Sequence, residues 1–364
     1  MGAMTARRRA TPRRHAATVV RVAIVAFAVV MAVIPLPRAL VETVYSQRAY
    51  PIVRQLVIGF SSLTGLVLFD LLLMGVLVAL LGWWTLRLIR ASRGGRLRAL
   101  ASLASQTVAL AALLYLVFLG IWGLNYRRES LGERLGYTES RVTEPVLETL
   151  TAAAIANLNQ LYDSTQGGSW PQLDELPVRL GTAFERVQQR LGVSPVVSGL
   201  VPKLSLLTPY FRRAGIDGMV DPFFLQILVN ETVLPFERPF VTAHEWAHVA
   251  GFAHEAEANF VAWLICLEGD EAMRYSAWSF FVPRLLAALP ETSQQRLGAA
   301  LGPGPRSDFA AVRARLSRTI PIVRRNARRI NDRYLKANRV ASGVASYGEV
   351  LQLAVGTDLG RSQW

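Results

Sequence analysis

The chain has 364 residues, of which 52% are hydrophobic, and a net charge of +14. This length accommodates a membrane region and one globular domain, and the composition is too apolar for an average soluble protein. Residues 1–125 carry 14 arginines against two acidic residues, whereas residues 126–364 carry 26 basic and 24 acidic residues. The basic charge therefore belongs to the membrane part, and the balanced remainder gives no support for nucleic-acid binding. The single cysteine, Cys266, excludes an intrachain disulfide and zinc motifs built from paired cysteines.

Three apolar segments predict membrane-spanning helices at about residues 17–36, 66–86 and 99–124. The first lacks a convincing cleavage site and is interpreted as an uncleaved anchor. The second contains Asp70, which this placement puts near the membrane surface, and residues 40–62 before it are expected to form an interfacial helix. The third has no charge and ends in "IWGLNYRRES", which we interpret as an aromatic belt followed by arginines.

The distribution of arginines predicts how these helices are oriented. Five arginines precede residue 15 and five lie in residues 87–98, whereas the connection between the first two spans has three, diluted by Glu42. Arginine-rich connections stay in the cytoplasm. We therefore expect a multi-pass protein of the cytoplasmic membrane, with a membrane domain at residues 1–125, the N-terminus in the cytoplasm, and residues 126–364 as an extracytoplasmic domain. The lipid bilayer is an expected partner.

The outer domain is predicted to be mostly helical. Its best strand candidate is residues 220–233, in which Phe223, Leu225, Ile227 and Val229 alternate with other side chains. This segment lies just before the histidine-rich helix, so it is interpreted as an edge strand that could pair with an extended peptide, or else as an ordinary core strand.

The stretch "FVTAHEWAHVAGFAHEAEANFVAWLICL" holds three of the four histidines of the chain. His244, Glu245 and His248 form an H-E-x-x-H pattern, which on a helix places both imidazoles on one face, where they can bind one ion. In such a site zinc polarises a carbonyl, and the glutamate acts as general base toward the attacking water. The pattern predicts Zn²⁺ as cofactor and Glu245 as the catalytic residue, although the pentapeptide by itself also occurs in unrelated helices.

A catalytic zinc needs a third protein ligand, and three residues compete for this role. His254 would complete H-E-x-x-H-x-x-G-x-x-H, the metzincin pattern, with Met273 in a Met-turn. Glu255 would begin a second helix on which Asn259 shares its face and could hydrogen-bond a ligand histidine. Glu257 lies on another side of that helix. Because "EAEANFVAWLICL" continues as a helix, as in the Glu-bearing second helix of gluzincins, Glu255 is favoured and His254 and Glu257 remain alternatives.

Four features together resemble the domain-of-unknown-function 3810 family, which comprises membrane-anchored zincin-like proteins. They are the three spans, "FLGIWGLNYRRE", "LPFERPFVTAHEWAHVAGFAHEAEANFVAWL" and "DRYLKANRVASGVASYGEVLQLAVG". The resemblance implies a gluzincin-like metallopeptidase domain with His244, His248 and the acidic E-x-E-A-N segment at its site, but it implies no particular substrate. The expected fold is mainly α: three transmembrane helices followed by a mostly helical zincin-like domain with a small β-sheet.

Two functions are compatible with these patterns. The first is a membrane-anchored zinc metallopeptidase that acts on a peptide or protein, which could itself be membrane-associated, with Tyr275, Tyr334 and Tyr347 as candidates for stabilising the oxyanion. The alternative is a non-catalytic binding or sensing module with a structural or vestigial zinc site. Glu245 favours the enzyme, because a structural site has no use for a carboxylate that is not a ligand.

Overall fold

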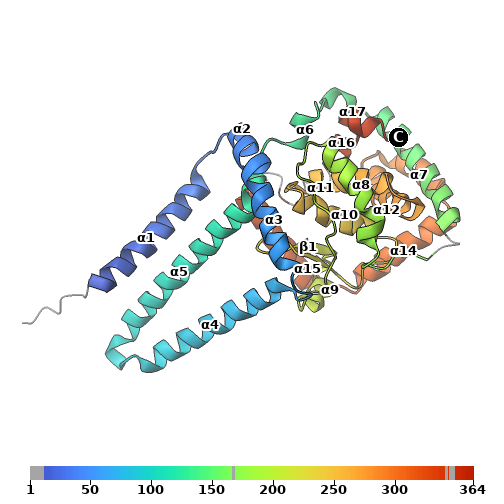
Figure 1. The fold of residues 1–364 in the computed structure, drawn as a ribbon. Helices are drawn as coiled ribbons and strands as arrows, with labels where there is room; N and C mark the ends of the chain where they lie inside the picture. Colours follow the sequence, from blue (N-terminus) through green and yellow to red (C-terminus); the bar gives the residue numbers. More distant parts are fainter. Residues whose placement is uncertain (1–11, 166–168, 341–342, 344–348) are drawn as a thin grey trace, which may run out of the picture. The chain divides into compact units, whose positions relative to one another are not determined.

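The computed structural model describes residues 12–165, 169–340, 343 and 349–364 (Figure 1). Its contacts divide the chain into two compact units. One comprises the described residues up to Leu36 together with Leu71–Ile121, and the other comprises Pro37–Asp70 and Trp122–Trp364. The second unit is thus assembled from two separate stretches of sequence. Leu71–Ile121 of the first unit separates these two stretches in the sequence.

The first unit contains the helices that are apolar enough to cross a membrane. They are α1 (Pro12–Val33), α4 (Leu68–Arg90), whose first residues belong to the second unit, and α5 (Arg96–Ile121), which follows the short 3₁₀ turn η2 (Arg93–Gly95). All three coincide with predicted spans, with ends that differ by a few residues. Within this unit α1 packs along α5.

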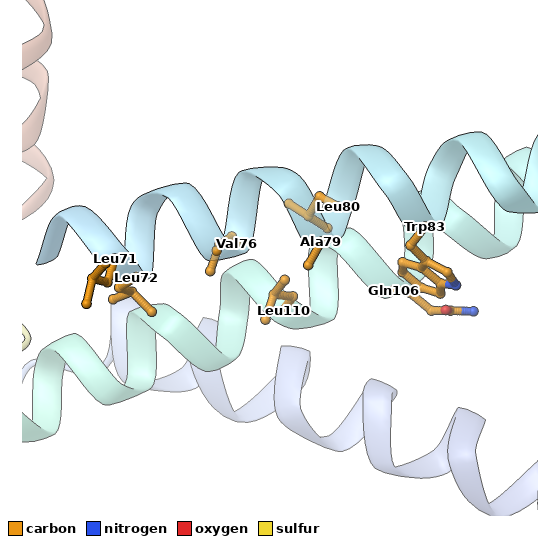
Figure 2. Close-up of a pocket in the computed structure, with 9 residues that line it drawn as sticks. Leu71, Leu72, Val76, Ala79, Leu80, Trp83, Gln106 and Leu110 are labelled. Carbon is orange, nitrogen blue, oxygen red and sulfur yellow. The ribbon is translucent and has the colours of Figure 1, made fainter. Parts of the chain in front are cut away.

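A mostly apolar groove of about 630 Å³ runs between α4 and α5 (Figure 2). Leu71, Val76 and Trp83 line it from α4, and Gln106 and Leu110 line it from α5. An apolar lining of this kind suits helices surrounded by lipid tails.

Residues 37–61 form three consecutive helical elements rather than the single helix expected there, and they pack into the second unit. They form α2 (Arg38–Leu40), the π-helix η1 (Val41–Ala49) and α3 (Tyr50–Ser61), and they belong to the second unit. The polar residues Glu42 and Arg54 and the ring of Tyr50 are buried there, because they bond to residues more than 80 positions further along the chain. The predicted boundary at residue 125 therefore does not coincide with the division between the compact units.

Among its described residues, the rest of the second unit contains helices and two short strands. Before the strands it comprises η3 (Gly123–Arg127), α6 (Leu131–Arg134), η4 (Glu139–Arg141), α7 (Glu144–Thr165), α8 (Leu176–Arg190) and α9 (Thr208–Ala214). After the strands it comprises α10 (Arg238–Val249), α11 (Glu255–Leu267), α12 (Glu271–Ala287), α13 (Glu291–Ala299), α14 (Pro303–Ser317), α15 (Pro321–Ala337), α16 (Val350–Gly356) and α17 (Asp358–Arg361).

The small sheet is present, and its strands are shorter than the predicted segment of residues 220–233. Strands β1 (Gly218–Val220) and β2 (Ile227–Val229) pair antiparallel, and Lys203 bridges to β2 from the other side. The segment between the strands turns back at Leu225, which has a φ of 55°. Of the two interpretations of this segment, the ordinary core strand is the one that β2 matches, because all three of its residues are buried, and β1 is the edge strand.

Helices α10 and α11 form the centre of the second unit, where Figure 1 shows them surrounded by α8, α12 and α16. Nearly every residue of α11 is buried, including Trp263, which stacks on Phe281 of α12. Trp246 of α10 packs on Phe184 of α8. Burial of these large aromatic rings is the main contribution to holding the two central helices in place.

Candidate metal centre

Helix α10 carries the H-E-x-x-H pattern near the middle of the second unit. Pro239 lies in its first turn, where the missing N–H costs nothing, and the Glu237 carboxylate accepts a hydrogen bond from the N–H of Leu234 just before the helix. His244 and His248 lie one turn apart, and their rings meet edge to face with centroids separated by 4.6 Å. The helical spacing therefore brings the two imidazoles together, as the sequence predicted.

The turn after α10 requires a glycine. Gly251 has a φ of +102°, and a β-carbon there would lie 3.2 Å from a ring carbon of Tyr50 and 3.3 Å from a guanidinium nitrogen of Arg128. The chain can therefore reverse tightly only with glycine at this position. This reversal lets α11 begin at Glu255 directly opposite the two histidines.

Three potential ligand atoms form a compact triangle. The distance between His244 Nε2 and His248 Nε2 is 3.1 Å, and Glu255 Oε2 lies 3.2 Å from the first and 3.5 Å from the second. Zinc with bonds of about 2.0–2.1 Å and tetrahedral angles holds its ligand atoms about 3.3 Å apart. The described residues contain one cluster of three such ligands, and it consists of His244, His248 and Glu255. Its spacing matches what a zinc ion requires.

The hydrogen bonds around the triangle leave its inner atoms available. His248 Nδ1 lies 2.8 Å from the carbonyl oxygen of Phe252, so in the neutral ring this nitrogen carries the proton and Nε2 presents a lone pair. Glu255 Oε2 and His244 Nδ1 are buried and have no hydrogen-bond partner among the described residues. A buried carboxylate oxygen without a partner is costly. A cation at the centre of the triangle would satisfy Glu255 Oε2, so the residues present fit a zinc ion.

The charges of the site are strongly coupled. Burial alone would lower the pKa of His248, but the Glu255 carboxylate outweighs this effect and raises the pKa to about 9. Burial alone would raise the pKa of Glu255, but the two histidines outweigh it and hold the pKa well below the usual range. Glu255 is therefore ionised at any physiological pH, as a metal ligand must be.

Glu245 lies beside this cluster but does not belong to it. Its side chain is buried against β1, where a β-carbon built on Gly218 would lie 2.5 Å from Glu245 Oε1. Burial raises the pKa of Glu245, and the two histidines oppose that rise. A carboxylate whose pKa is raised toward neutrality is suited to accept and return a proton.

The alternative third ligands point elsewhere. The ring of His254 packs edge-on against Tyr126, with centroids 5.8 Å apart. Glu257 accepts a hydrogen bond of 2.6 Å from the N–H of Leu131. Asn259 is buried near the site residues. Its amide nitrogen Nδ2 has no partner among the described residues, so this nitrogen does not donate the expected hydrogen bond to a ligand histidine. Met273 is buried in the first turn of α12 and packs against Gly269.

The three tyrosines proposed for the oxyanion have different surroundings. Tyr275 donates its hydroxyl to Asp308 and packs among other aromatic rings. Tyr334 of α15 packs edge-on against Tyr126, and burial together with the nearby Glu255 carboxylate raises its pKa. Tyr347 lies outside the described residues. Of the two that are described, Tyr334 is the one close to the candidate metal centre.

The sequence analysis missed the groups that hold the end of α10. The last carbonyls of a helix have no partners within it. Here four consecutive carbonyls accept bonds from side chains: Trp122 Nε1 donates to His248 (3.0 Å), Tyr50 Oη to Val249 (2.7 Å), Arg54 to Ala250 (3.4 Å) and Arg128 to Gly251 (3.1 Å). We call these four side chains the carbonyl clasp.

The carbonyl clasp is contributed by the two stretches that flank α4 and α5 in the sequence. Arg128 is itself fixed by Glu42, whose carboxylate accepts two hydrogen bonds of 2.7 Å from it. Trp122 and Tyr126, predicted as a membrane-interface belt, are buried in the second unit instead. The density of polar and aromatic residues in "IWGLNYRRE" was the available sign, but hydrogen-bond partners of this segment lie 79 to 126 residues away in the sequence.

The fold and the cluster together define a helical protein with three candidate membrane spans and a potential metal centre on two adjacent helices. The chain belongs to the family described as "Protein of unknown function (DUF3810)", which matches residues 45–355. The match includes α4, α5 and both helices of the candidate metal centre. No curated protein and no solved structure matches the chain.

Proposed function

We propose that this protein is a membrane-anchored, zinc-dependent metallopeptidase. The observation that carries the proposal is the triangle of His244, His248 and Glu255, whose ligand atoms lie 3.1–3.5 Å apart, beside a further carboxylate, Glu245, that is not part of it. Catalytic zinc sites use three protein ligands and leave a fourth position open, whereas structural sites use four. The cluster has the number of ligands expected of a catalytic site.

In this proposal Glu245 moves the protons. Zinc held by the three ligands would supply a Lewis acid that polarises the scissile carbonyl and lowers the pKa of the attacking water. Glu245 accepts the proton of that water on a carboxylate oxygen and then donates it to the leaving amine. The raised pKa of Glu245 supports the first step, because a more basic carboxylate accepts a proton more readily.

Strand β1 is suited to bind an extended peptide. Asp217 and Asp221 bond to β2 through the backbone, so the alternation of an antiparallel pair leaves the N–H and C=O groups of Gly218 and Val220 on the opposite edge. Peptides commonly add as a strand to such an edge. Because Gly218 contacts Glu245, a peptide bound along β1 would pass the proposed general base.

Tyr334 is our candidate for stabilising the oxyanion. Its raised pKa keeps the hydroxyl protonated, so it can act as a hydrogen-bond donor. Its side chain is still 36% exposed, which leaves room for a substrate group to approach it. A preoriented donor of this kind stabilises negative charge that develops on the carbonyl oxygen.

We place the second unit on the extracytoplasmic side of the cytoplasmic membrane, with the N-terminus in the cytoplasm. The distribution of arginines around α1, α4 and α5 supports this orientation. A reporter fused after Trp364 that is active only outside the cytoplasm tests it, and activity of a cytoplasmic reporter at the same position would reverse the orientation.

The proposal is tested on the full chain, purified in detergent or nanodiscs, by measuring zinc content and chelator-sensitive cleavage of a fluorogenic peptide mixture on the same samples. Glu245→Gln should retain zinc and lose cleavage. The matched control Glu257→Gln makes the same chemical change at a carboxylate that bonds Leu131, and it should keep both properties. Wild-type protein that binds no zinc, or Glu245→Gln protein that cleaves as well as wild type, would refute the proposal.

A further inference from the structure

The outward side of α3 is apolar and exposed. Ile52, Leu56 and Phe60 are spaced four residues apart, so they share one face of the helix, and each has more than half of its surface accessible. The opposite side of the same helix is buried and carries Tyr50 and Arg54 of the carbonyl clasp. Side chains of this size are not usually exposed in a row on a water-soluble surface.

This apolar face continues into two neighbouring segments. Leu63 and Leu66 are exposed in the turn that leads from α3 to α4. Lys203 Nζ donates to the carbonyls of Thr64 (2.9 Å) and Leu66 (3.2 Å), which brings the exposed Leu204 and Leu206 beside that turn. We call the outward face of α3, the 62–66 turn and the 204–206 loop the α3 apolar surface.

Asp70 ties this surface to the beginning of α4. Its carboxylate accepts a hydrogen bond of 2.6 Å from the Ser205 hydroxyl and one of 2.8 Å from the N–H of Leu206. Asp70 is buried by these contacts. The one acidic residue of the second apolar helix therefore fixes the 204–206 loop against the first turn of that helix.

We propose that the α3 apolar surface is embedded in the interfacial layer of the same bilayer that α4 crosses. With 23 residues, α4 is about 35 Å long, slightly more than the hydrocarbon core of about 30 Å, so its first turn lies close to the membrane surface. Leu66 is two residues and Leu63 five residues before Leu68. Because an extended chain spans no more than about 3.5 Å per residue, Leu63 and Leu66 lie within about 17 Å of Leu68 at the membrane surface.

The charges of the surface favour lipid over a polar partner. Between Ile52 and Leu66 the only charged residue is Arg54, and its side chain is buried on the other side of α3. The amine of Lys203 is directed to backbone carbonyls, and Asp70 is buried. An apolar helix face without charges, joined to a spanning helix, is typical of a segment that lies in the membrane interface.

The position of α3 has a consequence for the candidate metal centre. One side of the helix would contact lipid, while Tyr50 on its other side bonds the carbonyl of Val249, the residue after His248. The end of α10, next to His248, would then lie roughly one helix diameter, about 10 Å, from the lipid surface.

The test uses a fluorophore that responds to polarity, attached to single introduced cysteines in the full chain. Leu56→Cys and Leu206→Cys sample two separate segments of the surface, and Val178→Cys on α8 is the matched control, since Val178 is 84% exposed and lies outside the surface. The native Cys266 is fully buried and does not compete for the label. Each labelled protein is reconstituted in nanodiscs with and without lipids that carry a nitroxide quencher near the headgroup.

We expect the quenching lipids to reduce the emission at positions 56 and 206 at least twofold and to leave position 178 unchanged. Unquenched emission at both positions would overturn the proposal. A blue shift without quenching would overturn it as well, because a second protein copy rather than lipid would then cover the surface. Equal quenching at all three positions would also contradict it, since the dye itself would then be entering the bilayer. None of these outcomes depends on whether the protein is a peptidase.

Discussion

Replacing Gly218 with alanine should move the proposed general base without changing the metal ligands. The added β-carbon would lie 2.5 Å from Glu245 Oε1 and 3.1 Å from both Cδ and Cγ of Glu245, whereas ordinary contacts begin at 3.4 Å. The carboxylate must therefore shift by about 1 Å, and a displacement of that size at a reacting group costs on the order of 100-fold in rate. This loss corresponds to about 2.7 kcal/mol of transition-state stabilisation.

The assay compares kcat/KM for chelator-sensitive peptide cleavage and the zinc content of Gly218→Ala with those of wild type. The matched control is Gly181→Ala, because a β-carbon at Gly181 of α8 meets no atom within 4 Å and alanine is the better helix former. We expect Gly218→Ala to bind zinc normally and cleave about 100-fold more slowly, and Gly181→Ala to behave like wild type. Full activity of Gly218→Ala would show that Glu245 does not act from beside β1.

Three further predictions concern the scaffold. A fragment of residues 126–364 should fail to retain zinc that the full chain binds, because it lacks most of the carbonyl clasp; a fragment that retains zinc would show that the clasp is dispensable. Arg315→Met should lower the stability by about 2 kcal/mol, seen as a lower Tm in detergent, because the partly buried Arg315 bridges Asp217 and Glu237 at 2.6 and 2.9 Å. An unchanged Tm would refute that role. Burial raises the pKa of Asp221 from 3.8 to about 7, so the folded state binds its proton more tightly than the unfolded chain, and stability should fall as the pH rises between those values. Asp221→Asn, which stays neutral, should show a smaller fall in Tm between pH 5 and pH 8, and an equal fall would contradict the assignment.

Local patterns in the sequence were sufficient to predict the long helices and the two histidines. The three apolar segments are long enough to specify helices on their own, and the spacing of four between His244 and His248 fixes their common face. The choice of Glu255 over its alternatives depended on whether the helix resumed at once after the turn. The structure brings Glu255 to the histidines and directs His254 and Glu257 elsewhere.

The remaining features depend on contacts between residues that are distant in the sequence. The spacing of apolar residues in the sequence predicts that one face of α3 is apolar. It does not reveal that Tyr50 and Arg54, on the other face, donate hydrogen bonds to carbonyls about 200 positions later in the chain. The strand prediction was confirmed only in part for a similar reason. Ile227–Val229 form β2, but the alternation from Phe223 suited a longer strand, and the Asp221 carboxylate accepts the N–H groups of Phe223 and Phe224 and forms a turn there. Gly218 had no pattern at all, because its role arises only from its contact with Glu245.

X-ray absorption spectroscopy at the zinc edge of the metal-loaded full chain tests the central claim most directly. The account predicts one zinc per chain with two imidazole nitrogens and light oxygen ligands at about 2.0–2.1 Å, and the loss of this signal in Glu255→Ala. A chain that binds no zinc, or a spectrum with three imidazoles that persists in Glu255→Ala, would contradict the account.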